Sequence, residues 1–163
     1  MEPHDTARVT ISVNAAPERA FAAFTQEIDR WWQRGQRFRN GGAAASTMHL
    51  ESGVGGRFVE LVGEGSSARE VELGVITQWD PPRGLAMRWR NANFASHEWT
   101  FLEISFVPQG ECTRVTLQHR GWAALRADHP ARHGQQAARF IEHMGRWWGD
   151  LLGAYRAHAS DAA

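Results

Sequence analysis

The stretch HEWTFLEISFVPQGECTRVTLQH, residues 97–119, decides the fold more than any other part of the chain. Residues 97–107 and 112–119 alternate between apolar and polar side chains, and both runs are rich in β-branched or aromatic residues. Between them lies PQGE, residues 108–111, which contains the residue types of a tight turn. Two such runs joined by a short turn predict a β-hairpin, and therefore strands that run antiparallel.

The turn also sets the register of this hairpin. With residues 109–110 at the turn, Leu102 is expected opposite Leu117. Thr100 is then expected opposite His119. Because the two apolar residues must face the core, all four side chains are expected on the inner face of the sheet.

Upstream of the hairpin, the chain predicts one strand, a pair of short helices and further strands. Residues 8–13 alternate like a half-buried strand, and Pro17 then opens a helix. The helical pattern ends at Trp31 and Trp32, where a second short helical turn is expected, and residues 33–46 form a loop. Further strands are expected at residues 47–50, 57–62, 68–79 and 85–89.

The C-terminal region predicts one long amphipathic helix over residues 134–158. Its apolar stripe comprises Ala137, Ile141, Met144, Trp148, Leu151, Leu152 and Tyr155. The expected fold class is α+β: a curved antiparallel sheet of about six to seven strands wrapped around this helix, with a short helix pair after the first strand. Residues 1–163 are expected to form one domain with an ordered core over about 8–157. Bulky side chains on both walls make a cavity between sheet and helix plausible.

Composition excludes several classes of protein. The chain carries 18 basic and 18 acidic residues, so it has no excess of positive charge for binding nucleic acid or an anionic membrane. All 18 basic residues are arginine, which excludes the lysine chemistry of Schiff bases and P-loops. The single cysteine, Cys112, excludes an internal disulfide and a cysteine-rich zinc module.

Targeting signals and cofactor motifs are not recognisable either. Since no apolar run is long enough to span a membrane, a soluble cytoplasmic protein is expected. No cofactor is expected, because the glycine-rich segments at 53–56 and 63–65 do not lead from a strand into a helix. No metal site is expected, because His129, His133 and His143 have no fixed ligand geometry.

Several short motifs, taken together in order and spacing, resemble one known group of proteins. They are APERAF at 16–21, DRWW at 29–32, GGRF at 55–58, WDPP at 79–82 with LAMRW at 85–89, and TRVTLQHRGW at 113–122. Over about residues 9–155 the chain resembles the SRPBCC superfamily of START-like and Bet-v-1-like helix-grip proteins. It is most similar to a bacterial branch named after the C-terminal domain of the heat-shock-protein-90 ATPase activator. The resemblance implies a helix-grip fold but no single function, because the superfamily includes lipid carriers, hormone receptors, cyclases and hydrolases.

In the co-chaperone that gives this branch its name, the resemblance covers only one of two domains. The other domain carries much of the chaperone contact and has no counterpart in this sequence. Chaperone activation is therefore not the expected function. A protein-interaction or co-chaperone-like domain, with its cavity filled by its own tryptophans, is kept as one alternative.

The main hypothesis is a small binding protein that holds a hydrophobic or aromatic small molecule between the sheet and the C-terminal helix. The residues expected to line the ligand are Phe24, Trp31, Phe58, Met87, Trp89, Thr100, Leu102, Leu117, His119, Trp122, Met144 and Trp148. Thr100, His119 and Glu98 would orient the polar end of the ligand. For each apolar member, ordinary core packing is the competing interpretation.

His119 and Glu98 also support an enzymatic alternative. Both are expected at one end of the inner face, and a histidine beside a carboxylate can carry out general acid–base catalysis. They would then form the acid–base pair of a cofactor-free cyclase or hydrolase. The competing interpretation is a structural histidine that forms hydrogen bonds at the end of its strand.

Two tryptophan pairs, Trp31-Trp32 and Trp147-Trp148, bear on the oligomeric state. Adjacent helical residues point about 100° apart, so one member of each pair is expected inside and the other outside. Trp148 fits the inner stripe better than Trp147. The outer member of each pair would then be available for contact in a homodimer.

Overall fold

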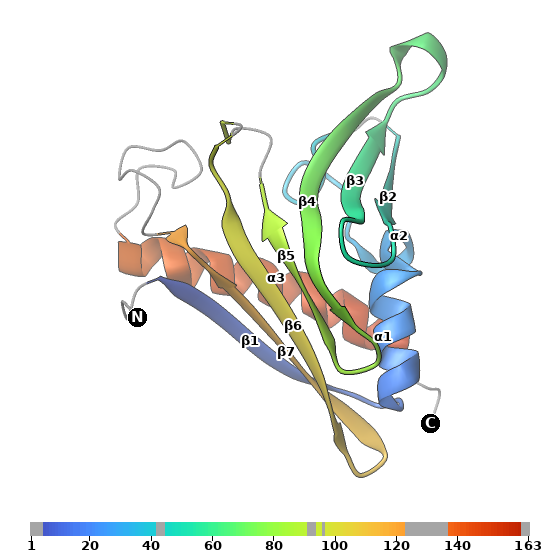
Figure 1. Ribbon diagram of the computed structural model, residues 1–163, viewed down its shortest axis with the longest axis vertical. Helices are drawn as coiled ribbons and strands as arrows, with labels where there is room; N and C mark the ends of the chain where they lie inside the picture. The colour runs from blue at the N-terminus through green and yellow to red at the C-terminus, as the bar shows by residue number, and fades with distance from the viewer. Residues whose placement is uncertain (1–4, 42–44, 91–93, 96, 123–136, 161–163) are drawn as a thin grey trace.

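The described chain forms a curved antiparallel sheet with helices on one side of it (Figure 1). This computed structural model describes residues 5–41, 45–90, 94–95, 97–122 and 137–160. Its strands are β1 (Thr6–Val13), β2 (Ser46–Leu50), β3 (Arg57–Val62), β4 (Arg69–Asp80), β5 (Gly84–Trp89), β6 (Thr100–Gln109) and β7 (Cys112–Arg120). Its α-helices are α1 (Pro17–Thr25), α2 (Ile28–Trp31) and α3 (Ala137–Ala159).

The strands follow the spatial order β1-β7-β6-β5-β4-β3-β2. Strands β2 to β7 each pair with their neighbour in sequence, and β1 joins the sheet beside β7. The long helix α3 crosses the inner face of the sheet and packs against β1, while α2 packs against β2 (Figure 1). The predicted α+β class, with its curved sheet, long C-terminal helix and short helix pair, is confirmed.

The short helix α1 is positioned by its first turn and by α3. Pro17 starts the helix, because its fixed φ suits helix entry and its missing N–H would have no partner there. Glu18 in the same turn faces the positive end of the helix dipole. The hydroxyl of Tyr155, fully buried on α3, donates a hydrogen bond to the carbonyl oxygen of Ala20 at 2.6 Å. This bond holds the two helices together inside the fold.

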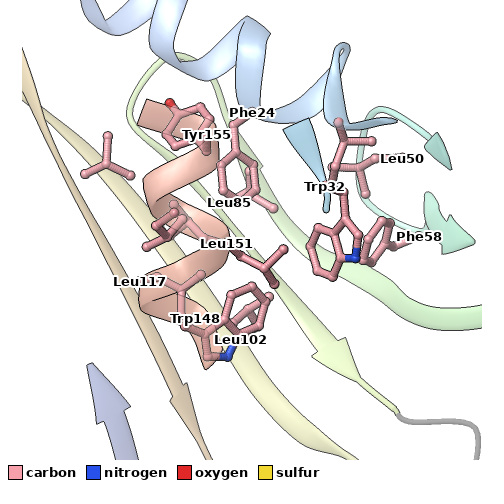
Figure 2. Close-up of a cluster of buried hydrophobic side chains, with 14 of the residues drawn as sticks. Phe24, Trp32, Leu50, Phe58, Leu85, Leu102, Leu117, Trp148, Leu151 and Tyr155 are labelled. Carbon is pink, nitrogen blue, oxygen red and sulfur yellow. The ribbon is translucent and has the colours of Figure 1, made fainter. Parts of the chain in front are cut away.

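The buried stripe of α3 faces the sheet and fills the centre of the core. It consists of Phe140, Met144, Trp148, Leu151, Leu152, Tyr155 and Ala159. Figure 2 shows Trp148 pointing from α3 towards Leu102 and Leu117 on the sheet. The predicted stripe was wrong at its N-terminal end, where Phe140 is buried and Ile141 is only half-buried.

The β6–β7 hairpin has a different register from the predicted one. Gln109 pairs with Cys112, so the two residues between them form the turn. Gly110 has a φ of +61°, a left-handed conformation that glycine adopts without strain. Leu102 therefore lies opposite His119, and the pairing is shifted by two residues from the predicted one. A shift by two keeps every side chain on the same face, so the predicted inner face is retained.

Both members of the first tryptophan pair are buried, so the prediction that one would be exposed was wrong. Trp31 and Trp32 are each 3% exposed. The angle of about 100° between adjacent helical residues does not apply here, because α2 ends at Trp31. Trp32 has an extended backbone, with φ −65° and ψ 114°. In the second pair Trp148 is fully buried, as predicted, whereas Trp147 is half-buried and packs against Trp32 and Phe38 instead of pointing outwards. The first pair thus offers no exposed tryptophan for a dimer contact.

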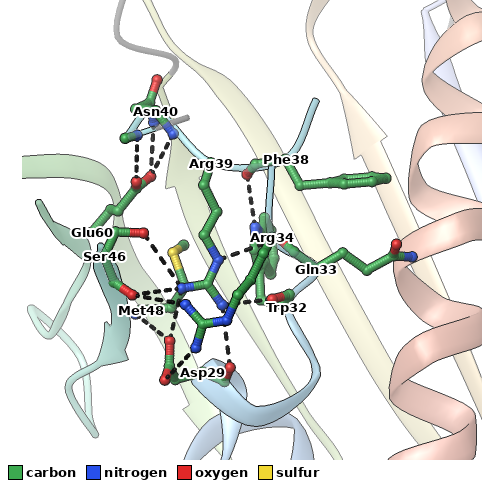
Figure 3. Close-up of polar contacts among 11 residues, drawn as sticks. Asp29, Trp32, Gln33, Arg34, Phe38, Arg39, Asn40, Ser46, Met48 and Glu60 are labelled. Carbon is green, nitrogen blue, oxygen red and sulfur yellow. Dashed lines mark hydrogen bonds and ion pairs between the residues drawn. The ribbon is translucent and has the colours of Figure 1, made fainter. Parts of the chain in front are cut away.

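A buried cluster of charged and polar groups, which we call the arginine clasp, ties the segment after α2 to β2 (Figure 3). It consists of Asp29, Arg39, Ser46 and Met48. The Arg39 guanidinium, on a side chain that is 2% exposed, donates to Asp29 Oδ1 at 2.9 Å and to the Ser46 carbonyl oxygen at 3.0 Å. Burial disfavours the ionised form of Asp29, but the Met48 N–H and the Arg39 guanidinium outweigh this effect and lower the pKa of the carboxyl group.

The clasp occupies the open edge of the sheet. The Ser46 carbonyl and the Met48 N–H point away from β3. Arg39 donates a hydrogen bond to the Ser46 carbonyl, and Asp29 accepts one from the Met48 N–H. The fully buried carboxylate of Glu60 holds the loop that precedes β2, because it accepts hydrogen bonds from the backbone N–H groups of Asn40 and Gly41, each at 2.8 Å. Free N–H and C=O groups at a sheet edge would invite pairing with another strand. The loop therefore protects β2 without being a strand itself.

We expect Arg39→Met to lower the free energy of unfolding by about 3 kcal/mol, because it leaves a partly buried carboxylate and four backbone carbonyl groups without the guanidinium that donates to them. Arg34→Met is the matched control. Arg34 also donates to Ser46 and lies 3.6 Å from Asp29, but its side chain is 66% exposed. Arg34→Met should lower the free energy of unfolding by less than about 1 kcal/mol. Urea unfolding followed by circular dichroism measures both, and equal losses would contradict the assigned role of burial.

Candidate functional site

His119 lies on the inner face of β7, and its ring is fully buried. Its Nε2 lies 2.6 Å from Thr100 Oγ1, and the Trp148 indole N–H donates to its Nδ1 at 3.0 Å. An indole N–H can only donate, so Nδ1 is the unprotonated nitrogen. The ring is therefore the neutral tautomer that carries its proton on Nε2 and donates it to Thr100. These two bonds connect α3 with β7 and β6.

The surroundings of His119 hold it in the neutral form. Burial lowers the pKa of His119 to about 3, because the charged ring would lose its solvation. Both ring nitrogens are already occupied by Thr100 and Trp148. No lone pair is left to take a proton from a substrate at neutral pH. This geometry favours the structural interpretation of His119 over the catalytic one.

Glu98 is placed close to the same end of the sheet but does not pair with His119. Its Oε1 accepts the backbone N–H of Ala95 at 2.7 Å, just before β6 begins. The hydrogen-bond partners of His119 are Thr100 and Trp148 instead. The two candidates for acid–base catalysis are therefore not brought together by a hydrogen bond.

Trp122 covers His119 and carries an unpaired polar group. Its ring centroid lies 4.4 Å from that of His119 and 4.9 Å from that of Phe140, and Phe94 lies 6.3 Å away. The Trp122 Nε1–H is buried and has no hydrogen-bond partner among the described residues. Buried indole N–H groups normally have an acceptor. We call Phe94, His119, Trp122, Phe140 and Trp148 the aromatic end of the interior.

All twelve residues predicted to line a ligand are buried in the structure. Three of them, Trp89, Trp122 and Trp148, surround His119, with ring centroids 4.4 to 5.9 Å from the centroid of the imidazole. Thr100 accepts the hydrogen bond of His119. Leu102 and Leu117 face Trp148 from the sheet (Figure 2), Met87 lies on the inner face of β5, and Met144 lies on α3.

The other predicted lining residues lie farther along the interior. Phe24 and Trp31 pack against Tyr155, each with ring centroids 5.2 Å from it. Phe58 packs against Trp32 at 5.2 Å (Figure 2). These residues belong to the packing of α1, α2 and β3 rather than to the aromatic end.

Sequence reasoning missed two members of the aromatic end and the clasp. Phe140 could have been found, because it lies four residues before Met144 and continues the stripe of α3. Phe94 has no periodic signal, since neither it nor Ala95 belongs to a helix or strand. Arg39 lies in a loop whose pattern predicts nothing about burial.

Within the described residues, no group of three or more His, Cys, Asp or Glu side chains is arranged to hold a metal ion. His129 and His133 lie outside the described residues. None of the described helices is both long enough and apolar enough to cross a membrane.

We expect acidification to destabilise the fold through His119. Its pKa is about 3 in the folded chain against an ordinary value of about 6.5, so between these values the unfolded chain binds more protons. The contribution of His119 to the free energy of unfolding is complete above about pH 6.5. It falls by up to about 1.4 kcal/mol per pH unit as the pH drops towards 3. Nitrogen NMR at pH 5 should show a neutral His119 ring protonated at Nε2. A ring that titrates near its ordinary pKa would contradict the assignment.

The fold recurs in solved structures with little sequence similarity to this chain. An Hsp90 activator from Plasmodium falciparum is 16% identical with a TM-score of 0.65, covering 94% of each chain. The Aha1 dimer from Colwellia psychrerythraea is 16% identical with a TM-score of 0.60, covering 94% of this chain and 96% of that one. Both likenesses show the fold alone.

A third solved structure is more similar in sequence. The anthrahydroquino-γ-pyrone synthase Txn09, complexed with SUM, is 27% identical with a TM-score of 0.58, covering 95% of this chain and 98% of that one. No curated protein matches the chain.

A family model agrees with the resemblance seen in the sequence motifs. The model described as Activator of Hsp90 ATPase homolog 1-like protein matches residues 14–148. The match runs from the segment after β1 through the sheet and as far as Trp148 on α3. The chain belongs to the family of Activator of Hsp90 ATPase homolog 1-like proteins.

Proposed function

We propose that the chain binds an uncharged, planar aromatic small molecule between the sheet and α3, at the aromatic end of the interior. The observation that carries this proposal is the buried Trp122 Nε1–H, which has no acceptor among the described residues. Leaving such a donor unpaired costs about 1–3 kcal/mol. A ligand oxygen that accepts this hydrogen bond would recover that free energy.

The aromatic rings around Trp122 favour a flat ligand. His119, Phe140 and Phe94 surround the indole, so a flat aromatic molecule would find ring edges and faces to pack against. Met144 is 9% exposed and Phe94 is 8% exposed, more than the other members of the α3 stripe and the aromatic end. A methionine is unbranched and adapts its rotamer readily, so it can move to admit a ligand.

The charge of the surroundings favours an uncharged ligand. The buried charged side chains among the described residues are Arg39 and Glu60, and both belong to the region of the clasp near β2. At the aromatic end His119 is neutral, and no charged side chain is buried beside it in the described chain. An ionised ligand would lose its hydration there without gaining a counter-charge. The site therefore suits a neutral molecule with a carbonyl or ether oxygen.

The likeness to Txn09 supports an aromatic ligand class. That protein is an anthrahydroquino-γ-pyrone synthase, and the two chains match over nearly their whole lengths at 27% identity. Anthrahydroquinones and γ-pyrones are planar ring systems with oxygen substituents. These are the properties that Trp122 and its neighbours would select.

Fluorenone and fluorene test the proposal, because the two molecules differ only by the carbonyl oxygen. We expect fluorenone to bind the protein, and Trp122→Phe to weaken it about tenfold while changing fluorene binding less than about twofold. Trp79→Phe is the matched control, since Trp79 packs against Phe21 on α1, away from the aromatic end. Quenching of tryptophan fluorescence gives the dissociation constants. No fluorenone binding, or equal weakening of both ligands by Trp122→Phe, would overturn the proposal.

A second candidate function is a cofactor-free cyclase, and the synthase activity of Txn09 is the observation that favours it. In this version Glu98 and His119 would be the acid–base pair, although His119 must first give up a hydrogen bond to take part. An open-chain precursor of an anthrahydroquinone-fused γ-pyrone is the substrate class to test. Glu98→Gln should abolish conversion while circular dichroism shows an intact fold. Conversion at the original rate would remove Glu98 from the mechanism.

A third candidate is a protein-interaction or co-chaperone-like domain whose interior is filled by its own side chains. Trp32, Trp89 and Trp148 favour it, because their ring centroids lie only 5.6 to 6.3 Å apart. The solved Aha1 dimer also fits such a role, and a second copy of this chain is one candidate partner. A protein that binds neither fluorenone nor fluorene would support this candidate over the first.

A further inference from the structure

The outer face of the sheet carries a row of arginine and aromatic side chains, on the side away from α3. Arg88 on β5, Phe101 on β6 and Arg120 on β7 lie directly side by side in the sheet register. Trp99 stacks against Arg88, whose guanidinium carbon lies 4.3 Å from the ring centroid, and Arg90 lies 5.5 Å from the same ring. We call these five residues the outer patch.

The aromatic rings hold the guanidinium groups of the outer patch in fixed positions. The guanidinium carbon of Arg120 lies 5.1 Å from the centroid of Phe101, and Phe101 is 39% exposed. The Nε of Arg88 is buried and has no hydrogen-bond partner among the described residues. Arginine stacked on an aromatic ring keeps the edge of its planar fork free to bind carboxylates in a bidentate manner.

The part of this face formed by β1, β5, β6 and β7 has an excess of positive charge although the whole chain is neutral. Outward-facing residues of β1, β5, β6 and β7 include Arg8, Arg88, Arg114 and Arg120, against the single acid Glu103. Within the described part of the chain, none of these four arginines forms an ion pair.

Several arginines elsewhere on the surface are paired instead, although Arg69 and Arg156 are exposed and form no ion pair within the described chain. Arg19 pairs with Glu27, Arg83 with Asp80, and Arg57 with Glu70. The outer face therefore leaves its positive charge available to a partner.

We propose that the outer patch binds an acidic segment of a partner protein. Exposed aromatic residues combined with arginine are typical of the residues that contribute most to protein interfaces. The excess charge on this face is complementary to aspartate and glutamate side chains. The patch lies on the opposite side of the sheet from the aromatic end, so it is independent of the ligand proposed above.

The stacking in the outer patch favours a polypeptide over a nucleic acid. Single-stranded nucleic acids bind through bases that stack on free aromatic faces. The ring of Trp99 has Arg88 and Arg90 over it, and Phe101 has Arg120 over it, with Gly121 close beside it. Each ring thus already has a guanidinium group over it, whereas Arg88 and Arg120 form no ion pair within the described chain and their guanidinium edges can bind carboxylates.

A fluorescein-labelled oligoglutamate peptide tests the proposal by fluorescence anisotropy at low ionic strength. We expect the unaltered protein to bind the peptide, and the double variant Arg88→Gln/Arg120→Gln to bind it at least about tenfold more weakly. Arg69→Gln/Arg156→Gln is the matched control, because it removes the same charge from exposed positions on β4 and α3. The control should change binding by less than about twofold. Thermal unfolding of both variants verifies that the fold is intact.

Three results would overturn the proposal. The first is an absence of peptide binding by the unaltered protein. The second is equal weakening in both double variants, which would indicate general charge attraction. The third is tighter binding of an oligothymidylate than of the peptide, with the same loss in Arg88→Gln/Arg120→Gln. That result would identify the outer patch as a nucleic-acid surface.

Discussion

The hydrogen bonds of His119 connect the helix to the sheet and set the geometry of the interior. Trp148 donates from α3 to one ring nitrogen, and the other nitrogen donates to Thr100 on β6. Because the indole can only donate, this arrangement exists only with a neutral imidazole. Burial also favours the neutral ring, so the tautomer and the packing support one another. Trp122 lies against this ring, and its own N–H is left without an acceptor in the described chain.

The arginine clasp has a comparable role at the edge of the sheet, but it uses charge. Arg39 and Asp29 are stabilised by each other and by backbone groups of β2 (Figure 3). Buried charges of this kind need such partners, because an unpaired one would be strongly destabilising. The interior is thus divided into a charged region near β2 and a neutral aromatic end near β7. This division is why we expect an uncharged ligand.

Local patterns predicted most of the fold, and long-range contacts explain the errors. Alternation and turn residues placed the strands to within about three residues, since both depend on neighbours in sequence. The hairpin register was wrong because residues 109–110 and 110–111 both suit a tight turn, and the pairing of Gln109 with Cys112 places residues 110–111 in it. The expectation that one of Trp31 and Trp32 would lie outside was wrong because α2 is only four residues long and ends before Trp32.

The sequence predicted which residues of the candidate site face the interior, but not the hydrogen bonds that join them. The inner face, the buried tryptophan of α3 and the position of His119 all followed from periodicity. The bond between Trp148 and His119 joins residues far apart in sequence, so no local pattern reports it. The same holds for Arg39, whose partners come from α2 and β2. Which nitrogen of His119 carries the proton depends on such contacts alone.

The proposed ligand site at the aromatic end and the outer patch lie on opposite faces of one sheet, so binding at each can be tested without the other. The most direct measurement is native mass spectrometry of the freshly purified protein, compared with the same sample after denaturation. We expect an additional mass that is lost on denaturation and that belongs to an uncharged aromatic molecule with an oxygen acceptor. A bare protein mass, unchanged after incubation with a pool of aromatic metabolites, would contradict a ligand site in the interior.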